Sequence, residues 1–165
     1  MTDRIIGIDP SLSATGIATP SEAYTVATEA SDPQRLVKIH TAARIALIEG
    51  GRAHLAVIED LPTHAHGAGL TGMAQGVIRL ALVQFGVPYV AVTAATLKKF
   101  ATGSGNANKS DMRMALYKRA GLDIRDDNQV DAIWLRQIGL HLTDHRDAIA
   151  LPKAHTDALL KVKRP

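Results

Sequence analysis

The sequence predicts a single α/β domain in which a mixed five-stranded sheet is flanked by helices. Short runs of β-branched residues alternate with segments of helical period, and three such runs precede the first helical segment. Strands joined by short turns pair antiparallel, whereas strands joined by helical crossovers pair parallel. An antiparallel start with a parallel continuation follows. The 165 residues, 46% of them hydrophobic, can bury one core but are too few for two ordinary domains.

The first half of the chain supplies four predicted strands and two helices. Residues 4–9 form a buried strand because Ile5, Ile6 and Ile8 are β-branched and Pro10 stops the run. The segments that follow are strands at 16–18 and 24–27, a helix at 33–48 ended by two glycines, a strand at 54–59 and a helix at about 70–85.

The second half begins with a strand at 88–92. Thr93 is a good N-cap for a helix through Phe100. Residues 102–108 are rich in glycine and small polar residues, which predicts a mobile loop. Helices are expected at 109–120 and 128–142. We expect residues 1–143 to form the domain and residues 144–165 to form a loosely packed basic tail.

Composition excludes several classes of protein. The absence of cysteine excludes disulfides, thiolate metal sites and cysteine nucleophiles. The longest apolar stretches, such as 77–83 and 87–95, are much shorter than the roughly 20 residues of a membrane-spanning helix. Residues 1–3 do not begin a signal peptide. We therefore expect a soluble cytoplasmic protein with no membrane partner.

Basic residues are unevenly distributed along a chain whose formal net charge is only +3. One cluster lies between residues 98 and 119, and a second marks the tail. Such clusters are often solvated helix faces, and they bind a nucleic-acid backbone only if a functional site lies beside them. The candidate DNA-binding residues are Lys98, Lys99, Lys109, Arg113 and Lys118.

Acidic residues end two of the predicted strands and begin the last helix. Asp9 ends the first strand, Glu59 ends the strand at 54–59, and residues 126–131 supply further carboxylates. Taken singly, each has a structural explanation, because aspartate also starts turns and caps helices. Together they are harder to explain structurally, since buried like charges are costly unless a cation neutralises them.

Oxygen ligands of this kind suit magnesium. Asp127 and Asp131 are four residues apart and Asn128 and Asp131 three apart, so all three can share one helical face. Two metal ions about 3.5–4 Å apart can activate water and stabilise the leaving oxygen of a phosphodiester. The chemistry predicted is phosphodiester hydrolysis.

Four motifs resemble those of the RuvC-type Holliday junction resolvases. Residues 7–16 (GIDPSLSATG) resemble the first motif, 57–59 the second, 102–109 the flexible loop with its lysine, and 127–132 the final acidic motif. The match is collinear from about residue 4 to residue 140. The resemblance implies the ribonuclease-H-like fold, a homodimer, two Mg²⁺ ions replaceable by Mn²⁺, and paired nicks across a four-way DNA junction.

The resemblance also implies roles for individual residues. Asp9, Glu59 and Asp131 match the family's metal-binding carboxylates, and Lys109 matches a lysine near the scissile phosphate. The position three before Asp131, acidic or histidine in relatives, is Asn128 here. The fourth metal ligand is therefore either Asn128 or the adjacent Asp127, and we favour Asp127 as the charged partner and catalytic carboxylate.

One departure from the family affects substrate selection. Pro62 stands where the bacterial enzymes place an aromatic side chain that wedges into the junction. His64, His66 and Leu70 in the same predicted loop are substitutes, although loop histidines are more often solvated. The missing wedge suggests broader selectivity that includes forks and flaps, and this would suit a phage resolvase acting in the host cytoplasm.

Gln75 and Arg79 lie one turn apart on the helix at 70–85, whose counterpart in the family contributes dimer contacts. Packing within the monomer explains the apolar members of that helix equally well.

Three other functions are compatible with parts of the pattern. An actin-like or sugar-kinase-type phosphotransferase also starts with a glycine-aspartate strand, but it needs a second domain for which this chain has no room. A catalytically idle DNA-binding module would not need Asp9, Glu59, Asp131 and Lys109 together. A ribonuclease H acting on hybrids fits the glycine loop and the last helix less well.

Overall fold

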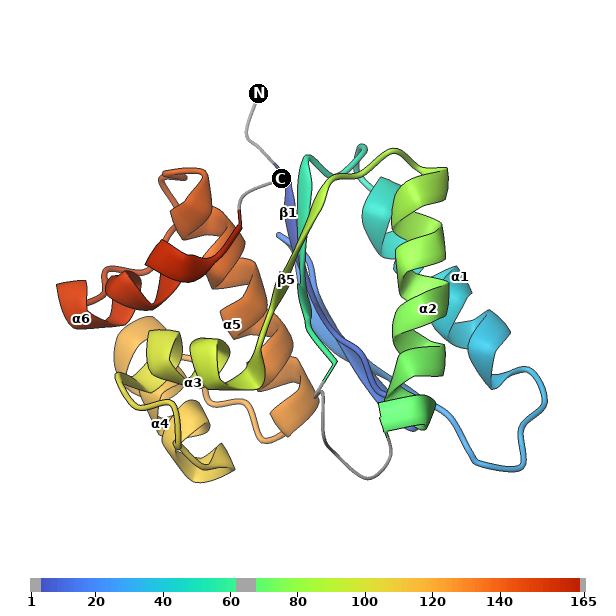
Figure 1. The fold of residues 1–165 in the computed structure, drawn as a ribbon, viewed down its shortest axis with the longest axis horizontal. Coiled ribbons are helices and arrows are strands. Elements are labelled where there is room, and N and C mark those ends of the chain that lie inside the picture. Colours follow the sequence, from blue (N-terminus) through green and yellow to red (C-terminus); the bar gives the residue numbers. More distant parts are fainter. Residues whose placement is uncertain (1–3, 62–67, 164–165) are drawn as a thin grey trace.

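The computed structural model describes residues 4–61 and 68–163, which fold into three layers with a sheet between two groups of helices (Figure 1). The strands are β1 (Ile5–Asp9), β2 (Ala14–Ala18), β3 (Ala23–Ala27), β4 (Leu55–Glu59) and β5 (Tyr89–Val92). The helices are α1 (Arg35–Ile48), α2 (Ala68–Gln84), α3 (Ala94–Thr102), α4 (Lys109–Ala120), α5 (Asp127–Leu142), α6 (Lys153–Thr156) and the 3₁₀ helix η1 (Asp157–Lys161).

The sheet has the order β3-β2-β1-β4-β5. The pairs β1–β2 and β2–β3 are antiparallel, and the pairs β1–β4 and β4–β5 are parallel. The predicted fold class, a mixed five-stranded sheet with an antiparallel start and a parallel continuation, is confirmed. Because β1 and β4 are parallel neighbours, Asp9 and Glu59 both stand at the same edge of the sheet.

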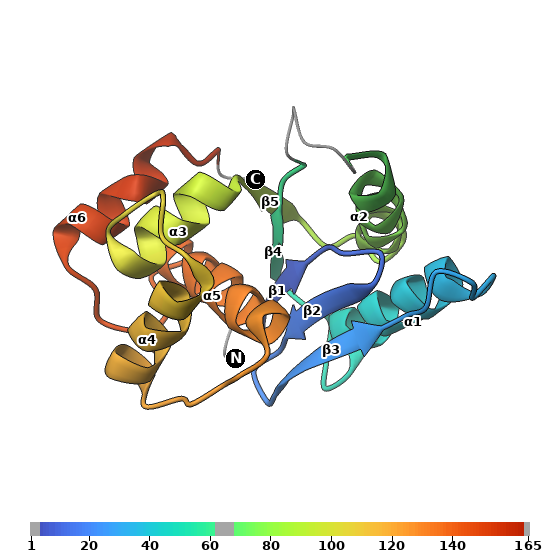
Figure 2. The ribbon, with the colours of Figure 1, turned by 90° about the horizontal axis from the view of Figure 1, so that it is seen from below.

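Both faces of the sheet are buried, which explains why β1 and β4 are apolar at almost every position. Ile5 and Val57 point to the side covered by α3, α4 and α5, whereas Ile6 and Ile58 point to the side covered by α1 and α2. Figure 2 shows the same two groups of helices on opposite sides of the sheet. Trp134 and Phe100 pack edge to face within the first core, with ring centroids 6.1 Å apart.

Glycines allow α5 to lie directly on the sheet. A Cβ on Gly16 would come within 2.1 Å of the backbone oxygen of Asn128, and a Cβ on Gly7 within 2.1 Å of that of Ala132. Further along the helix, a Cβ on Gly139 would likewise clash with the side chain of Ile5. The helix therefore runs along β1 in the opposite direction, and its first turn comes to rest beside the carboxyl end of β1.

Replacing Gly16 with alanine is expected to lower the free energy of unfolding by roughly 1–3 kcal/mol, because the added methyl group must displace helix backbone. The same displacement moves the first turn of α5 away from Asp9. Gly76→Ala is the matched control, since a Cβ there meets nothing within 4 Å and alanine favours the helix. Chemical denaturation measures both variants, and equal stability of the two would contradict this account of the packing.

Side chains cap the three helices that surround the carboxyl edge. The hydroxyl of Thr93 accepts from Thr96 N, as predicted, and Asn108 forms a capping box with Asp111 at the start of α4. Asp126 caps α5 by accepting from the backbone of Asn128 and Gln129. Gly103, with a φ of +87°, ends α3 in the left-handed conformation that favours glycine. The segment between α3 and α4 thus has a defined start and a defined end.

The C-terminal segment packs more closely than the sequence predicts. Instead of a loose tail, residues 153–161 form α6 and η1. His155 is buried, and its Nδ1 donates to the carbonyl of Phe100 at 2.9 Å. Leu151, Leu159 and Val162 pack against the core. The two short helices place these apolar residues against the core. Helices of four and five residues contain too few turns for their periodicity to be detected in the sequence.

Within residues 4–61 and 68–163, no helix is both long enough and apolar enough to cross a membrane.

Candidate active site

Three predicted carboxylates converge where β1, β4 and the first turn of α5 meet. Asp9 ends β1, Glu59 ends β4 and Asp131 lies in the second turn of α5. Glu59 and Asp131 line a pocket of about 340 Å³ that is open to solvent. Its lining also includes Ala94, Lys98, Asn108, Lys109, Met112, Asp127 and Val130. Each element that borders the pocket therefore contributes a polar side chain to it.

The carboxylates are only partly exposed, and they repel one another. Burial, with the nearby charges of Glu59 and Asp131, raises the pKa of Asp9 well above its usual value. Burial and the charge of Asp131 raise the pKa of Glu59 to about 7. Burial and the charge of Asp127 raise the pKa of Asp131 to about 6. Among residues 4–61 and 68–163, no buried cation neutralises this concentration of negative charge, as expected of a site that binds an external cation.

Two lysines moderate that charge from the rim of the pocket. Lys109 Nζ lies 3.0 Å from Asp127 Oδ2, and this ion pair raises the pKa of the lysine. The charge of Lys98 lowers the pKa of both Glu59 and Asp131. Lys109 is nevertheless highly exposed, with 79% of its side chain accessible. It can therefore leave Asp127 when a stronger anion, such as a phosphate, enters.

Asp127 and Asn128 have different surroundings in the structure. The Asn128 amide donates to Asp126 Oδ1 at 3.1 Å, within the cap of α5. Thr25 on β3 donates to the other oxygen of the same carboxylate at 2.7 Å, which ties this cap to the sheet. Asn128 does not line the pocket, whereas Asp127 does. The geometry therefore supports Asp127 as the charged partner of Asp131.

The carboxylates do not form a ready-made cage for one ion. Across the described ranges 4–61 and 68–163, no three His, Asp or Glu side chains are arranged so that together they could hold a metal ion. Magnesium usually takes only one or two protein carboxylates and completes its shell with water and substrate phosphate. The donor set, hard oxygens with raised pKa values in an open pocket, fits that kind of binding.

The sequence pattern singled out Gln75 but did not show that this residue anchors Glu59. Gln75 on α2 is almost fully buried, and its Nε2 donates to the Glu59 carbonyl at 2.8 Å. One turn later, Arg79 Nη2 lies 3.4 Å from Asp60 Oδ1 and the guanidinium lies over the ring of Tyr89. The one-turn spacing of Gln75 and Arg79 was the available signal. Both side chains contact the end of β4 within one chain.

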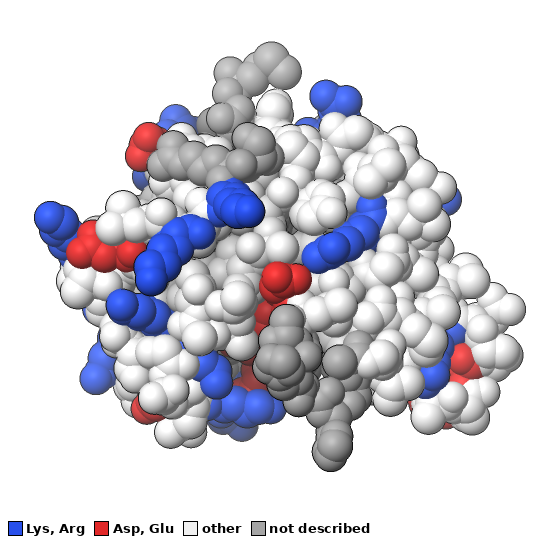
Figure 3. Space-filling model, viewed as in Figure 1, with Lys and Arg blue, Asp and Glu red and all other residues white. Residues whose placement is uncertain are grey.

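The remaining predicted DNA-binding residues lie on α3 and α4, two of the helices that border the pocket. Lys99 is on α3, and Arg113 and Lys118 are on α4. Figure 3, viewed as Figure 1, shows Lys and Arg side chains spread over the side of the molecule that α3, α4 and α6 form. The predicted wedge position Pro62 and the substitutes His64 and His66 fall outside the described residues, whereas Leu70 lies in α2 and is exposed.

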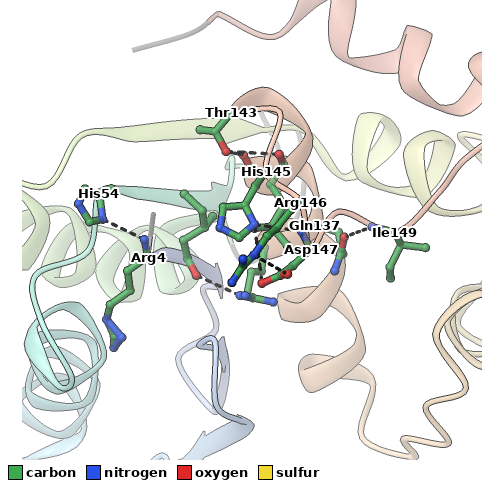
Figure 4. Close-up of polar contacts among 12 residues, drawn as sticks. Arg4, His54, Gln137, Thr143, His145, Arg146, Asp147 and Ile149 are labelled. Atoms are coloured by element: carbon green, nitrogen blue, oxygen red, sulfur yellow. Dashed lines mark hydrogen bonds and ion pairs between the residues drawn. The ribbon is translucent and has the colours of Figure 1, made fainter. Parts of the chain in front are cut away.

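A second pocket, of about 430 Å³, lies at the opposite end of the sheet. Figure 4 shows polar contacts at this end of the sheet, where the backbone N–H of Arg4 donates to His54 and Asp147 lies within 4 Å of both His145 and Arg146. Arginines and carboxylates are mixed in its lining, so the charges largely compensate one another. None of the predicted site residues lies in this pocket.

Known proteins resemble this chain in sequence and in structure. No protein-family model matches it. It is 36% identical over 135 residues to the crossover junction endodeoxyribonuclease RuvC of Rhodopirellula baltica, which covers 72% of this chain and 74% of the relative. It is 29% identical over 144 residues to the enzyme of the same name from Synechococcus, covering 79% and 93%.

Two solved structures share the fold. The structure of Thermus thermophilus RuvC gives a TM-score of 0.72 at 21% identity, covering 86% of this chain and 97% of that one. T. thermophilus RuvC in complex with Holliday junction substrate gives a TM-score of 0.70 at 23% identity, covering 81% and 90%.

Proposed function

Because the chain belongs to the RuvC family of crossover junction endodeoxyribonucleases, we propose that it is a Holliday junction resolvase that hydrolyses phosphodiesters of branched DNA. The observation that carries the proposal is the pocket in which Glu59, Asp127 and Asp131 meet Lys98 and Lys109, with Asp9 in electrostatic contact. A pocket that combines metal-binding oxygens with phosphate-binding cations suits a phosphodiester.

The catalytic groups we assign are Asp9, Glu59, Asp127, Asp131 and Lys109. Two Mg²⁺ ions, for which Mn²⁺ would substitute, would activate the attacking water and stabilise the leaving oxygen once bound. Asp9, Glu59 and Asp131 are the proposed ligands, with Asp127 favoured over Asn128 as the fourth. Lys109, which pairs with Asp127, would release it and neutralise charge that develops on the phosphate.

The basic side chains around the pocket would hold the DNA arms. Lys98 and Lys99 lie on α3, and Arg113 and Lys118 lie on α4 together with Lys109. Contacts of this type supply affinity that falls steeply with salt and carry no base specificity. Selection of four-way junctions, forks or flaps would therefore depend on the shape of the branch and on how many arms reach this surface.

Paired nicks require two active sites, so we propose a homodimer. The outer face of α2 exposes Leu70, Met73, Leu80 and Val83, an apolar set that a second copy could cover. The same helix holds Glu59 through Gln75. In a dimer paired through α2, the Gln75–Glu59 hydrogen bond would connect the interface helix to each active site.

The test is cleavage of labelled four-way junctions, replication forks and linear duplexes, with and without Mg²⁺. We expect metal-dependent nicking of branched substrates and little cleavage of the duplex. Intact binding of branched DNA without cleavage in Mg²⁺ or Mn²⁺ would contradict the proposal and would favour an idle DNA-binding module.

A further inference from the structure

Tyr117 is unusual among the aromatic residues of this chain. The sequence contains six, and all of them lie in the described parts of the structure. Trp134 and Phe100 are fully buried, and the others besides Tyr117 are partly covered: Tyr24, Phe85 and Tyr89. Tyr117 alone is exposed, with 56% of its surface accessible, and Met114 beside it is 49% exposed. Within the described residues, no hydrogen bond or ring contact holds this side chain.

Tyr117 lies in one row with the active-site lysine. Lys109, Arg113 and Tyr117 are four residues apart in α4, and residues at this spacing form a ridge along a helix surface. Lys109 begins the ridge at the active-site pocket, where it pairs with Asp127. Arg113 follows, and its Nε donates to the Ile124 carbonyl at 3.0 Å, which steadies the side chain. The row therefore leads from the active site through two cations to an exposed ring.

A shallow pocket of about 430 Å³ runs beside this ridge, lined by Ser110, Arg113, Met114, Tyr117 and Asp123. Its size falls within the range of pockets that hold small organic groups. An apolar wall next to a guanidinium suits a planar base attached to a phosphate. The charge of the helix agrees, because α4 carries Lys109, Arg113, Lys118 and Arg119 against Asp111 alone.

We propose that Tyr117 stacks against an unpaired base of the DNA strand that leaves the active site, an inference that rests on the proposed function. Duplex DNA keeps its base faces covered, so only an unpaired nucleotide can use the ring. Tyr117 is eight residues beyond Lys109, a rise of about 12 Å. A strand in B-form duplex rises about 3.4 Å per nucleotide and an unpaired strand can be more extended, so the contacted base lies within about four nucleotides of the scissile phosphate. The surface thus favours forks, flaps and opened junctions.

The test compares Tyr117→Ala with Tyr117→Phe in binding assays in EDTA. Stacking on an aromatic residue contributes roughly 1–3 kcal/mol per base, so Tyr117→Ala is expected to weaken binding of a flapped substrate roughly 5- to 150-fold. Tyr117→Phe keeps the ring and should bind like the wild type. Affinity for a fully paired linear duplex should be the same for all three proteins.

An abasic scan of the unpaired strand locates the contact. An abasic site at one of the first four nucleotides should weaken binding to the wild type as much as Tyr117→Ala does, and should have no added effect on that variant. Because Tyr117 is exposed, the thermal midpoints of the variants should match.

Unchanged flap affinity in Tyr117→Ala, with Asp9-dependent nicking intact, would overturn the stacking contact and leave the proposed function standing. Loss of self-association in Tyr117→Ala, with unchanged DNA affinity, would also overturn it and would assign this face to a second copy of the chain. If the wild type does not nick branched DNA, or if Asp9→Asn nicks it equally well, the proposed function itself would be overturned.

Discussion

Asp9→Asn is expected to lower metal-dependent nicking of four-way junctions by at least roughly 1000-fold, since loss of a metal ligand costs several kcal/mol of transition-state stabilisation. Asparagine keeps the shape of the side chain but not its charge. Asp9 lies in electrostatic contact with Glu59 and Asp131. DNA binding in EDTA should persist, or become tighter, because one charge that repels phosphate is removed. Gel assays of nicking and of binding measure the two effects separately.

Asp144→Asn is the matched control. Asp144 is exposed and has a φ of 49°, a conformation that asparagine adopts readily. It lies after the C-terminal end of α5, whereas the carboxylate cluster surrounds the start of that helix. This variant should nick junctions like the wild type. Retained nicking in Asp9→Asn would exclude a mechanism that depends on this carboxylate.

Glu59→Gln is expected to stabilise the metal-free protein at pH 8 by up to about 3 kcal/mol while it abolishes nicking. The pKa of Glu59 rises from 4.5 to about 7 on folding, and each unit corresponds to about 1.36 kcal/mol. Burial is the largest cause of the rise, followed by the charge of Asp131. Glutamine has nearly the same shape and needs no cation to balance it.

The sign of the pH dependence follows from the raised pKa. Below about pH 4.5 the glutamate is protonated in both the folded and the unfolded states, and the variant has no advantage. Between about pH 4.5 and 7 the unfolded chain releases a proton that the folded chain retains, so the wild type loses stability as the pH rises. Above about pH 7 the loss is complete. Asp131, with a pKa raised to about 6, adds a loss of the same sign that ends at lower pH.

Urea denaturation at pH 4.5 and pH 8, in EDTA and in Mg²⁺, measures this effect. The stability advantage of Glu59→Gln should appear at pH 8 in EDTA and shrink when Mg²⁺ stabilises the wild type. Glu29→Gln, which changes an exposed glutamate, is the control and should show no such dependence. A wild type that is equally stable at both pH values in EDTA would contradict the raised pKa of Glu59.

The parts of the fold that could be predicted from sequence are those that local chemistry dictates. Ile5, Ile6 and Ile8 make β1 apolar on both faces, which is what a strand between two helical layers requires. Thr93 caps α3 with its own hydroxyl. The same local patterns placed Asp9 and Glu59 at the ends of their strands. Because β1 and β4 are parallel neighbours, these two ends lie at the same edge of the sheet.

Other features depend on contacts between residues far apart in the sequence. Gln75 holds the backbone of Glu59 from another element, and its polarity alone did not identify its partner. The C-terminal helices form because α3 and the core offer a surface for His155 and Leu159. An isolated helix as short as α6 has too few hydrogen bonds to form without such a surface.

The sequence by itself determined which carboxylates and lysines are available and on which elements they stand, because side-chain chemistry and strand ends are local properties. Only the tertiary structure decided which of them meet. The close approach of α5 to Gly7 and Gly16 brings Asp131 to Asp9, and the cap of α5 turns Asn128 away while Asp127 faces Lys109. These choices depend on backbone packing to within an ångström, which no local pattern in the chain encodes.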